Sequence, residues 1–220
     1  MNSALIFANG DMGDGPALAG ALEQAVAADH PLIIAVDGGL RHVDALHRIP
    51  DVVIGDFDSV DFTSLKVAQQ AGAETIQLPT HKDETDLEAA LKLVAARGCR
   101  IIRIIGAYGE RLDQVMANLY LLSLPELRQR DVQIIDGRQT AWLAYPGTTI
   151  LHGAPGDTVS LLPLRGDVEG IETGELEYPL RRETLSFGPA RGVSNVMLTP
   201  TARVSFEAGL LLIVHTVGRA

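Results

Sequence analysis

Short runs rich in apolar residues recur through the first 137 residues, and amphipathic stretches separate them. Runs such as Ala4–Ala8 and Leu32–Val36 contain no polar residue, as expected of strands buried on both faces of a sheet. Strands that alternate with helices predict an α/β unit with a doubly wound, Rossmann-like parallel sheet. The predicted strands are Ala4–Ala8, Leu32–Val36, Val52–Ile54, Glu74–Leu78, Ile101–Ile105 and Val132–Ile135.

The stretches between these strands have helical periodicity. The clearest one places Leu87, Ala90, Leu91 and Val94 on one face, and Gly98 ends it. The other predicted helices cover Ala17–Ala28, 40–47, Leu65–Ala71 and 112–119.

The pattern changes after about Arg138, where helical periodicity disappears and turn signals containing Gly or Pro recur. Short alternating runs such as Thr158–Leu161 and Arg203–Phe206 lie between these turns. This spacing predicts a small antiparallel β-sandwich or barrel-like domain. We therefore expect two domains, an α/β domain over residues 1–137 and a β domain over residues 138–220.

Polar loops follow the strands of the predicted parallel sheet. In such sheets ligands bind outside the carboxyl ends of the strands, so these loops are expected to form one site. The loops are Asn9–Gly15, Asp37–Gly39, Asp56–Ser59, Lys82–Asp86 and Gly106–Asp113.

Asp56 and Asp58 form a D-x-D pair at the end of an apolar run. If this segment stays extended, the two carboxylates share a face and Phe57 points back into the fold. Like charges about 4 Å apart repel by roughly 4 kcal/mol at an effective dielectric of about 20, so the pair indicates either a solvated turn or a bound cation. Hard divalent cations such as Mg²⁺ bind one or two carboxylates together with substrate phosphate oxygens.

The neighbouring charged residues each allow two interpretations. Asp83 and Asp86 occupy possible N-cap and N3 positions of the next helix, or they belong to the acidic site. Lys82 is either a phosphate contact or a surface lysine, and Arg111 with Asp113 is either part of the site or a surface ion pair. The histidines show no metal-ligand spacing.

Composition narrows the class of protein. A formal net charge of −10 over 220 residues argues against a nucleic-acid partner. Met1–Leu5 lacks a basic segment, and the apolar run 210–214 is far shorter than the roughly 20 residues that cross a bilayer. Cys99 is the only cysteine, and we expect it to be a buried structural thiol. These features predict a cytoplasmic protein with no membrane partner.

The ordered set of motifs resembles the thiamine pyrophosphokinase family. The set comprises Asp37-Gly38-Gly39, Gly55–Ser59, Lys82–Asp86, Gly109–Gln114 and Ser194-Asn195. The resemblance implies an enzyme that converts thiamine and ATP to thiamine diphosphate and AMP with Mg²⁺. It also implies a homodimer whose active sites lie between subunits, with a catalytic domain over 1–137 and a thiamine-binding β-sandwich over 138–220.

The same resemblance assigns roles to individual residues. It implies that Asp56, Asp58 and Asp86 bind Mg²⁺ and that Asp113 faces thiamine. Asp58, Asp83 and Asp113 stay open as acceptors of the thiamine proton. The further implied contacts of nucleotide or thiamine are Asp37, Gly38, Ser59, Lys82, Arg111, Gln114, Ser194 and Asn195.

The chain departs from the family pattern at two places. Many bacterial members have histidine where Gln114 stands, and some members have a tryptophan soon after the Ser-Asn pair, where Val196–Leu198 stand here. Two other functions stay open on the residues alone. One is a different Mg²⁺-dependent nucleotidyl- or glycosyltransferase with a D-x-D site, and the other is a non-catalytic protein that binds thiamine or a nucleotide.

Overall fold

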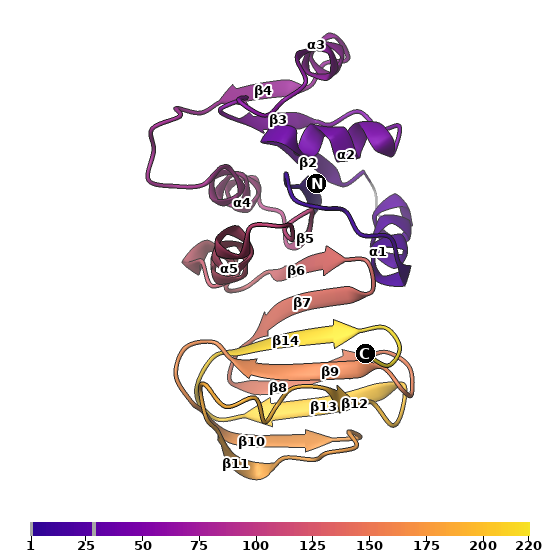
Figure 1. The fold of residues 1–220 in the computed structure, drawn as a ribbon, viewed down its shortest axis with the longest axis vertical. Coiled ribbons are helices and arrows are strands. Elements are labelled where there is room, and N and C mark those ends of the chain that lie inside the picture. Colours follow the sequence, from indigo (N-terminus) through magenta and orange to yellow (C-terminus); the bar gives the residue numbers. More distant parts are fainter. Residues whose placement is uncertain (1, 28–29) are drawn as a thin grey trace. The chain divides into compact units, whose positions relative to one another are not determined.

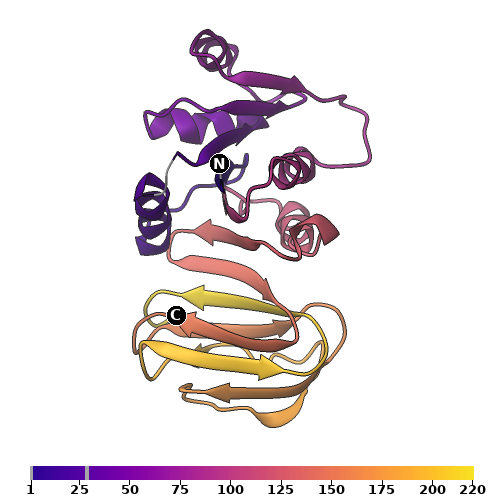
Figure 2. The ribbon, with the colours of Figure 1, turned by 180° about the vertical axis from the view of Figure 1, so that it is seen from behind.

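The computed structural model describes residues 2–27 and 30–220. It divides into two compact units, Met1–Gly137 and Arg138–Ala220. Figures 1 and 2 show the two opposite sides of the ribbon, with helices confined to the first unit among the described residues. The predicted α/β fold followed by an antiparallel β-sandwich is confirmed.

The described part of unit 1 contains six parallel strands in the order β6-β5-β1-β2-β3-β4. Central β1 pairs with both β2 and β5, so that Ile6 lies beside Ile34 on one side and Ile104 on the other. The strands are β1 (Ser3–Phe7), β2 (Leu32–Val36), β3 (Val52–Gly55), β4 (Glu74–Gln77), β5 (Ile101–Ile105) and β6 (Asp131–Asp136).

Helices cover both faces of this sheet: α1 and α2 lie on one side and α4 and α5 on the other (Figures 1 and 2). The side chains of Leu18, Leu40 and Leu65 join Leu5 and Phe7 in one buried cluster. The helices are α1 (Pro16–Ala27), α2 (Leu40–Ala45), α3 (Phe62–Gln70), α4 (Asp86–Ala96) and α5 (Leu112–Leu121), with short 3-10 turns at Asp37–Gly39 (η1) and Pro125–Leu127 (η2).

The strand order reverses at β1. The chain runs outward from β1 to β4 along one half of the sheet and continues with β5 and β6 on the other half. The loops after β1 and β5 therefore leave from neighbouring strands at the switch point, where open α/β sheets bind ligands.

Two local predictions need correction. Thr85, and not Asp83, is the N-cap of α4, because its side chain accepts a hydrogen bond from the Glu88 amide, and Asp86 is the first helical residue and not the third. Helix α3 begins three residues before the predicted Leu65, because Asp61 caps it by accepting from Ser64 N. The predicted end of the first helix, Ala28, lies outside the described residues.

Unit 2 consists of two antiparallel sheets with the strand orders β12-β9-β14-β7 and β11-β10-β13-β8. Buried side chains from both sheets, among them Leu161, Ile171 and Ile213, form its core, and Trp142 packs against it. The strands are β7 (Gln139–Ala144), β8 (Gly147–His152), β9 (Thr158–Pro163), β10 (Val168–Gly174), β11 (Arg181–Leu185), β12 (Asn195–Val196), β13 (Thr201–Phe206) and β14 (Leu211–Thr216).

Within unit 2, a buried carboxylate holds the C-terminal residues in place through hydrogen bonds. Asp157 accepts hydrogen bonds from Gly218 N at 2.7 Å and Ala154 N at 2.8 Å, and it lies 2.9 Å from His215 Nε2. Burial alone would raise the pKa of Asp157, but these hydrogen bonds hold it below its ordinary value.

Two further predictions concern the single cysteine and the absence of a membrane-spanning segment. Cys99 is fully buried, and burial raises the pKa of its thiol, in agreement with a structural role. None of the described helices has the length and apolar composition that crossing a membrane requires.

Candidate active site

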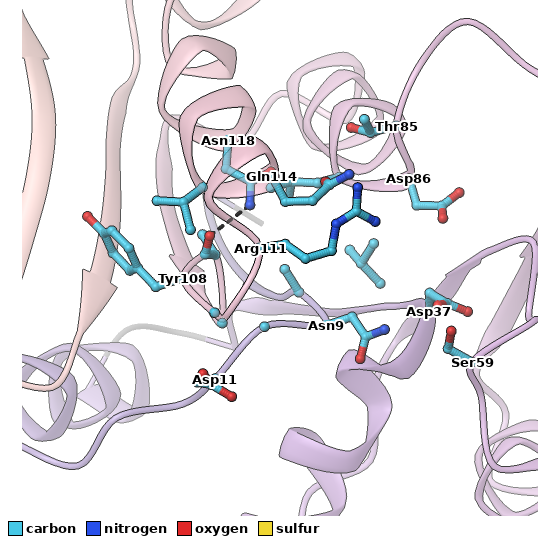
Figure 3. A pocket seen from close by; sticks show the side chains of 18 of the residues that line it. Asn9, Asp11, Asp37, Ser59, Thr85, Asp86, Tyr108, Arg111, Gln114 and Asn118 are labelled. Atoms are coloured by element: carbon cyan, nitrogen blue, oxygen red, sulfur yellow. Dashed lines mark hydrogen bonds between the residues drawn. The ribbon is translucent and has the colours of Figure 1, made fainter.

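A cavity of about 650 Å³ lies in unit 1 at the carboxyl ends of the parallel strands. Loops that follow β1, β2, β3, β4 and β5 all contribute to its wall, so the predicted edge of the sheet does form one site (Figure 3). Its polar lining residues are Asn9, Asp11, Asp37, Asp56, Asp58, Ser59, Lys82, Thr85, Asp86, Tyr108, Glu110, Arg111, Gln114 and Asn118.

Three carboxylates converge in this cavity. Asp37, Asp56 and Asp58 each offer an oxygen, and these oxygens all lie within 4.8 Å of one another. Asp37 is buried, Asp56 is partly buried and Asp58 is exposed. The arrangement offers a divalent cation three carboxylate oxygens from side chains that range from buried to exposed.

The turn that carries Asp56 and Asp58 is not extended, contrary to the sequence-based expectation. Phe57 has a φ of 64°, in the left-handed region, and the amide of Asp58 donates to Asp56 Oδ1 at 3.3 Å. The two carboxylates share the site because the chain turns at Phe57, and the Phe57 ring packs against the core as expected. Ser59 Oγ donates to Asp58 Oδ1 at 2.7 Å.

Asp37 reaches the site from a turn that requires small neighbours. A Cβ on Gly38 would lie 2.3 Å from Asn9 Oδ1, and one on Gly39 would lie 2.0 Å from the carbonyl oxygen of Phe7. Asp37 itself has a φ of 48°. The Asp37-Gly38-Gly39 sequence therefore lets α2 begin directly against the end of β1.

The position of Asp37 is electrostatically unfavourable for a charged carboxylate. Burial raises the pKa of its carboxyl, and the charges of Asp58 and Asp86 raise it further, although the amides of Gly38 and Ser59 act in the opposite direction. Its buried Oδ1 has no hydrogen-bond partner among the described residues. A buried carboxylate oxygen without a donor, beside two further carboxylates, fits a divalent cation.

Lys82 and Asp86 form an ion pair at the cavity wall. Lys82 Nζ lies 2.9 Å from Asp86 Oδ1 and also donates to the carbonyl of Pro79 at 3.0 Å. The hydrogen bond to Asp86 raises the pKa of Lys82, and the charge of Asp56 adds to the effect. Lys82 is thus held charged close to the acids.

Arg111 and Asp113 form a second, exposed ion pair, with Nη2 and Oδ2 2.6 Å apart. The hydrogen bond from Arg111 lowers the pKa of Asp113. Arg111 and Gln114 line the cavity, whereas Asp113 and Asp83 are exposed and lie outside its lining.

The two loops at the switch point line part of the cavity and are hydrogen-bonded to each other. Gly10 N donates to Gly106 O at 2.7 Å, and Asp11 N donates to Tyr108 O at 2.6 Å. Asn118 Nδ2 on α5 donates to Ala107 O at 2.8 Å (Figure 3). Burial and the charge of Asp136 raise the pKa of Tyr108 to about 12, so its phenol stays protonated.

Ser194 and Asn195 belong to unit 2. Asn195 is buried, and its amide bonds the main chain of Tyr178 in both directions, accepting from N at 3.0 Å and donating to O at 2.7 Å. Ser194 has a φ of 62°, and its amide donates to Ser160 Oγ. This pair therefore shapes the surface of unit 2 around Tyr178, which is exposed.

Two family models match consecutive parts of the chain. Residues 24–135 match the catalytic domain of thiamin pyrophosphokinase, and residues 148–211 match its vitamin B1 binding domain. The chain belongs to the thiamin pyrophosphokinase family. It is therefore an enzyme of thiamine diphosphate biosynthesis that uses ATP as its co-substrate.

Individual members of the thiamin pyrophosphokinase family support this assignment. The chain is 25% identical to the Bacillus subtilis thiamine pyrophosphokinase over 189 residues, which cover 86% of this chain and 88% of the relative. The crystal structure of a B. subtilis thiamine pyrophosphokinase superposes with a TM-score of 0.86 at 25% identity and covers 98% of this chain and 99% of its own. A family member from Enterococcus faecalis superposes with a TM-score of 0.84 at 26% identity, covering 97% and 98%.

Several cavity residues were not among the predicted contacts. Asn9, Asp11, Thr85, Tyr108, Glu110 and Asn118 all line the cavity. All but Asn118 lie in the loops that were expected to form the site, so the position of these loops after the strands was the available signal. Asn118 lies inside α5, where sequence offers no comparable signal.

Proposed function

We propose that Asp37, Asp56 and Asp58, with Asp86 beside them, hold Mg²⁺ and through it the phosphates of ATP. The observation that carries this proposal is the convergence of three carboxylate oxygens within 4.8 Å of one another, beside a buried Asp37 Oδ1 that has no hydrogen-bond partner among the described residues. A Mg²⁺ ion held by these residues would supply charge neutralisation for the phosphates and for the departing AMP.

The protein's own side chains need to carry out little covalent chemistry in this transfer. Pyrophosphoryl transfer depends mainly on positioning and on charge neutralisation. The thiamine hydroxyl oxygen forms a bond to the β-phosphorus as the bond from that phosphorus to the oxygen bridging to the α-phosphorus breaks, and the electron pair leaves with AMP. Lys82 and Arg111, both at the cavity wall, would contact the phosphates.

Asp58 is the acceptor we propose for the thiamine proton. It is exposed to the cavity, and Ser59 holds one of its oxygens. Asp113 is the weaker base, because its bond to Arg111 lowers its pKa, and Asp83 lies outside the lining. Asp113 becomes available to face thiamine when Arg111 exchanges it for a phosphate. Gly38, Ser59 and Gln114 complete the proposed contacts.

We propose further that the chain acts as a homodimer in the cytoplasm, with Ser194 and Asn195 of one protomer holding thiamine at the site of its partner. The rigid support of Asn195 on Tyr178 suits a binding surface, and the single buried Cys99 suits a reducing compartment. Sedimentation at a working concentration should give twice the chain mass of 23.5 kDa. A monomer with full activity would contradict the shared site.

Product identification tests the proposed reaction. ATP, Mg²⁺ and thiamine should together yield AMP and thiamine diphosphate in equal amounts, and omission of thiamine should stop AMP release. ADP or pyrophosphate as the main product would favour a different nucleotide-using transferase. Thiamine binding measured by calorimetry without any AMP would indicate a non-catalytic binder.

The role of Asp58 is tested by Asp58→Asn. Loss of a general base and metal ligand should lower kcat by about 10²–10⁴, because a positioned base contributes about that factor. The matched control is Asp44→Asn, an exposed acid on α2 outside the cavity lining, which should keep wild-type turnover. Full activity of Asp58→Asn would remove this residue from the mechanism.

A further inference from the structure

Arg41 on α2 ties together the two loops beside the acid cluster. Its guanidinium donates to the carbonyls of Gly38 at 3.0 Å, Asn9 at 2.8 Å and Gly10 at 2.7 Å, and Nη1 also donates to Asn9 Oδ1. His42 Nε2 lies 2.8 Å from the Gly10 carbonyl. The loop after β1 is therefore held against the start of α2 by side chains that take no other part in the site.

This contact fixes the orientation of the Asn9 side-chain amide. A guanidinium carries only donors, so the Asn9 atom that faces Arg41 must be the acceptor Oδ1. Nδ2, with its two N–H donors, must then occupy the other branch of the amide. The amide packs directly on Gly38, where a Cβ would lie 2.9 Å from Nδ2.

The donor branch of Asn9 faces the cavity. In Figure 3 the amide nitrogen lies on the side of Asp37 and Ser59, and the oxygen turns away from them. Asn9 does not donate to Asp37 Oδ1, because that oxygen has no hydrogen-bond partner among the described residues. Two neighbouring lining side chains already have acidic partners, since Lys82 lies 2.9 Å from Asp86 Oδ1 and Ser59 donates to Asp58.

The chemistry of Nδ2 limits what it binds. An amide nitrogen does not coordinate a hard cation, and the amide oxygen is taken by Arg41, so Asn9 is not a further metal ligand. Its partner must be an acceptor that arrives with the substrate. Next to carboxylates that hold a cation, the acceptor is a phosphate oxygen that the same cation binds.

We propose that Asn9 is a substrate-binding residue that donates through Nδ2 to the phosphate chain of the nucleotide, and that Arg41 is the positioning residue that fixes its amide. The inference rests on the proposed use of the acid cluster for Mg²⁺-nucleotide. Asn9 precedes residue 24, where the match to the catalytic-domain model begins. Its role is therefore read from the geometry of this chain.

Asn9→Asp tests the donor. This change is isosteric and keeps an oxygen for Arg41, so the loop stays anchored, but it replaces Nδ2 by an anionic acceptor. Calorimetry with Mg²⁺ and a non-hydrolysable ATP analogue should show affinity at least about tenfold weaker than wild type, the factor that about 1.4 kcal/mol represents. Inorganic tripolyphosphate with Mg²⁺ should lose affinity by a similar factor, whereas the KM for thiamine should stay unchanged.

Arg41→Lys tests the positioning role. Lysine cannot donate to four acceptors at once, so the amide should rotate and nucleotide affinity should fall by about threefold to tenfold. In the Asn9→Asp background, where no amide orientation is left to fix, the same change should have little further effect. Equal, additive losses in both backgrounds would assign Arg41 a purely structural role and overturn its part of the proposal.

The outcomes separate this inference from the proposed function. Wild-type affinity in Asn9→Asp, together with normal Mg²⁺-nucleotide binding by the wild type, would overturn the role of Asn9 alone. A loss confined to the ATP analogue would place Asn9 on the nucleoside and contradict the phosphate contact. Absence of Mg²⁺-nucleotide binding by the wild type would contradict the proposed function, and this inference with it.

Discussion

Asp37 shows how single residues in this site favour function over stability. Its carboxyl is buried beside Asp58 and Asp86, its pKa is raised by that burial and by those charges, and its Oδ1 has no donor among the residues described. A buried charge without a partner is costly unless a ligand compensates it. The cost is understandable if a cation regularly occupies the site.

Asp37→Asn should therefore stabilise the metal-free protein and abolish its response to Mg²⁺. Asparagine tolerates the φ of 48° at this position, so the backbone is preserved. Removal of the charge should raise the metal-free Tm by roughly 2–4 °C, the shift that about 1 kcal/mol gives in a chain of this size. Thermal unfolding with and without Mg²⁺ measures both effects, and a lower metal-free Tm would refute the assigned penalty.

At the residue scale, the sequence predicted the acidic residues better than the turns and contacts that position the site. Asp56 and Asp58 were identifiable because two carboxylates follow a buried strand, although the turn at Phe57 was not. Asn9 lies in a loop that the topology rule selected, but its amide orientation depends on Arg41, which is 32 residues away. A single helical arginine carries no signal of such a contact.

At the scale of elements, the site depends on close contact between the loops after β1 and β5. Gly10 lies so near this junction that a Cβ would stand 1.9 Å from the Tyr108 carbonyl oxygen. Main-chain atoms on both sides leave no flexible group to move aside. The two loops and the strands that carry them are therefore coupled through one glycine.

Gly10→Ala should separate these loops and lower kcat/KM for ATP by about tenfold or more, because overpacking costs about 1–3 kcal/mol. Gly20→Ala is the matched control. Gly20 lies in α1 with open space around it, so alanine there should raise helix stability by about 0.5–1 kcal/mol and leave activity unchanged. Steady-state kinetics and thermal unfolding of the two variants compare them directly.

Asp157, which precedes β9 and contacts His215 of β14, gives a prediction about pH. The pKa of Asp157 is depressed in the folded state, so its contribution to the free energy of unfolding is present above the ordinary value of 3.8 and is lost as the pH falls through the folded pKa. Asp157→Asn should lower the stability of unit 2 at pH 7 by about 1–3 kcal/mol. It should also remove the part of the stability loss at low pH that protonation of Asp157 causes.

Trp142 is the only tryptophan of the chain and packs against the core of unit 2, so its fluorescence follows the unfolding of that unit. Denaturant titrations from pH 3 to pH 7 supply the comparison. Identical pH profiles for wild type and Asp157→Asn would show that the carboxylate does not contribute in this way.

The order of elements in unit 1 was predictable because buried parallel strands and amphipathic helices have distinct periodicities. Boundaries set by side-chain caps were less so, as Asp61 and Thr85 show. In unit 2 the alternating runs predicted strands and turns. Their pairing into two sheets depends on contacts between distant segments, such as β13 with β8, which periodicity does not encode.

At the scale of the whole molecule, the chain combines the proposed site for Mg²⁺-nucleotide in unit 1 with a β-sandwich that matches a vitamin B1 binding domain. A net charge of −10 would repel free triphosphate, and the acid cluster alone would do so more strongly. A cation held by the proposed site would offset this repulsion, and binding of the nucleotide would then depend on Mg²⁺.

Calorimetric titration with a non-hydrolysable ATP analogue, in the presence and absence of Mg²⁺, tests this central claim most directly. We predict tight binding by the wild type only when Mg²⁺ is present, and weak binding by the Asp56→Asn/Asp58→Asn double variant under both conditions. Binding of equal strength in the double variant and the wild type, with the same dependence on Mg²⁺, would contradict the account.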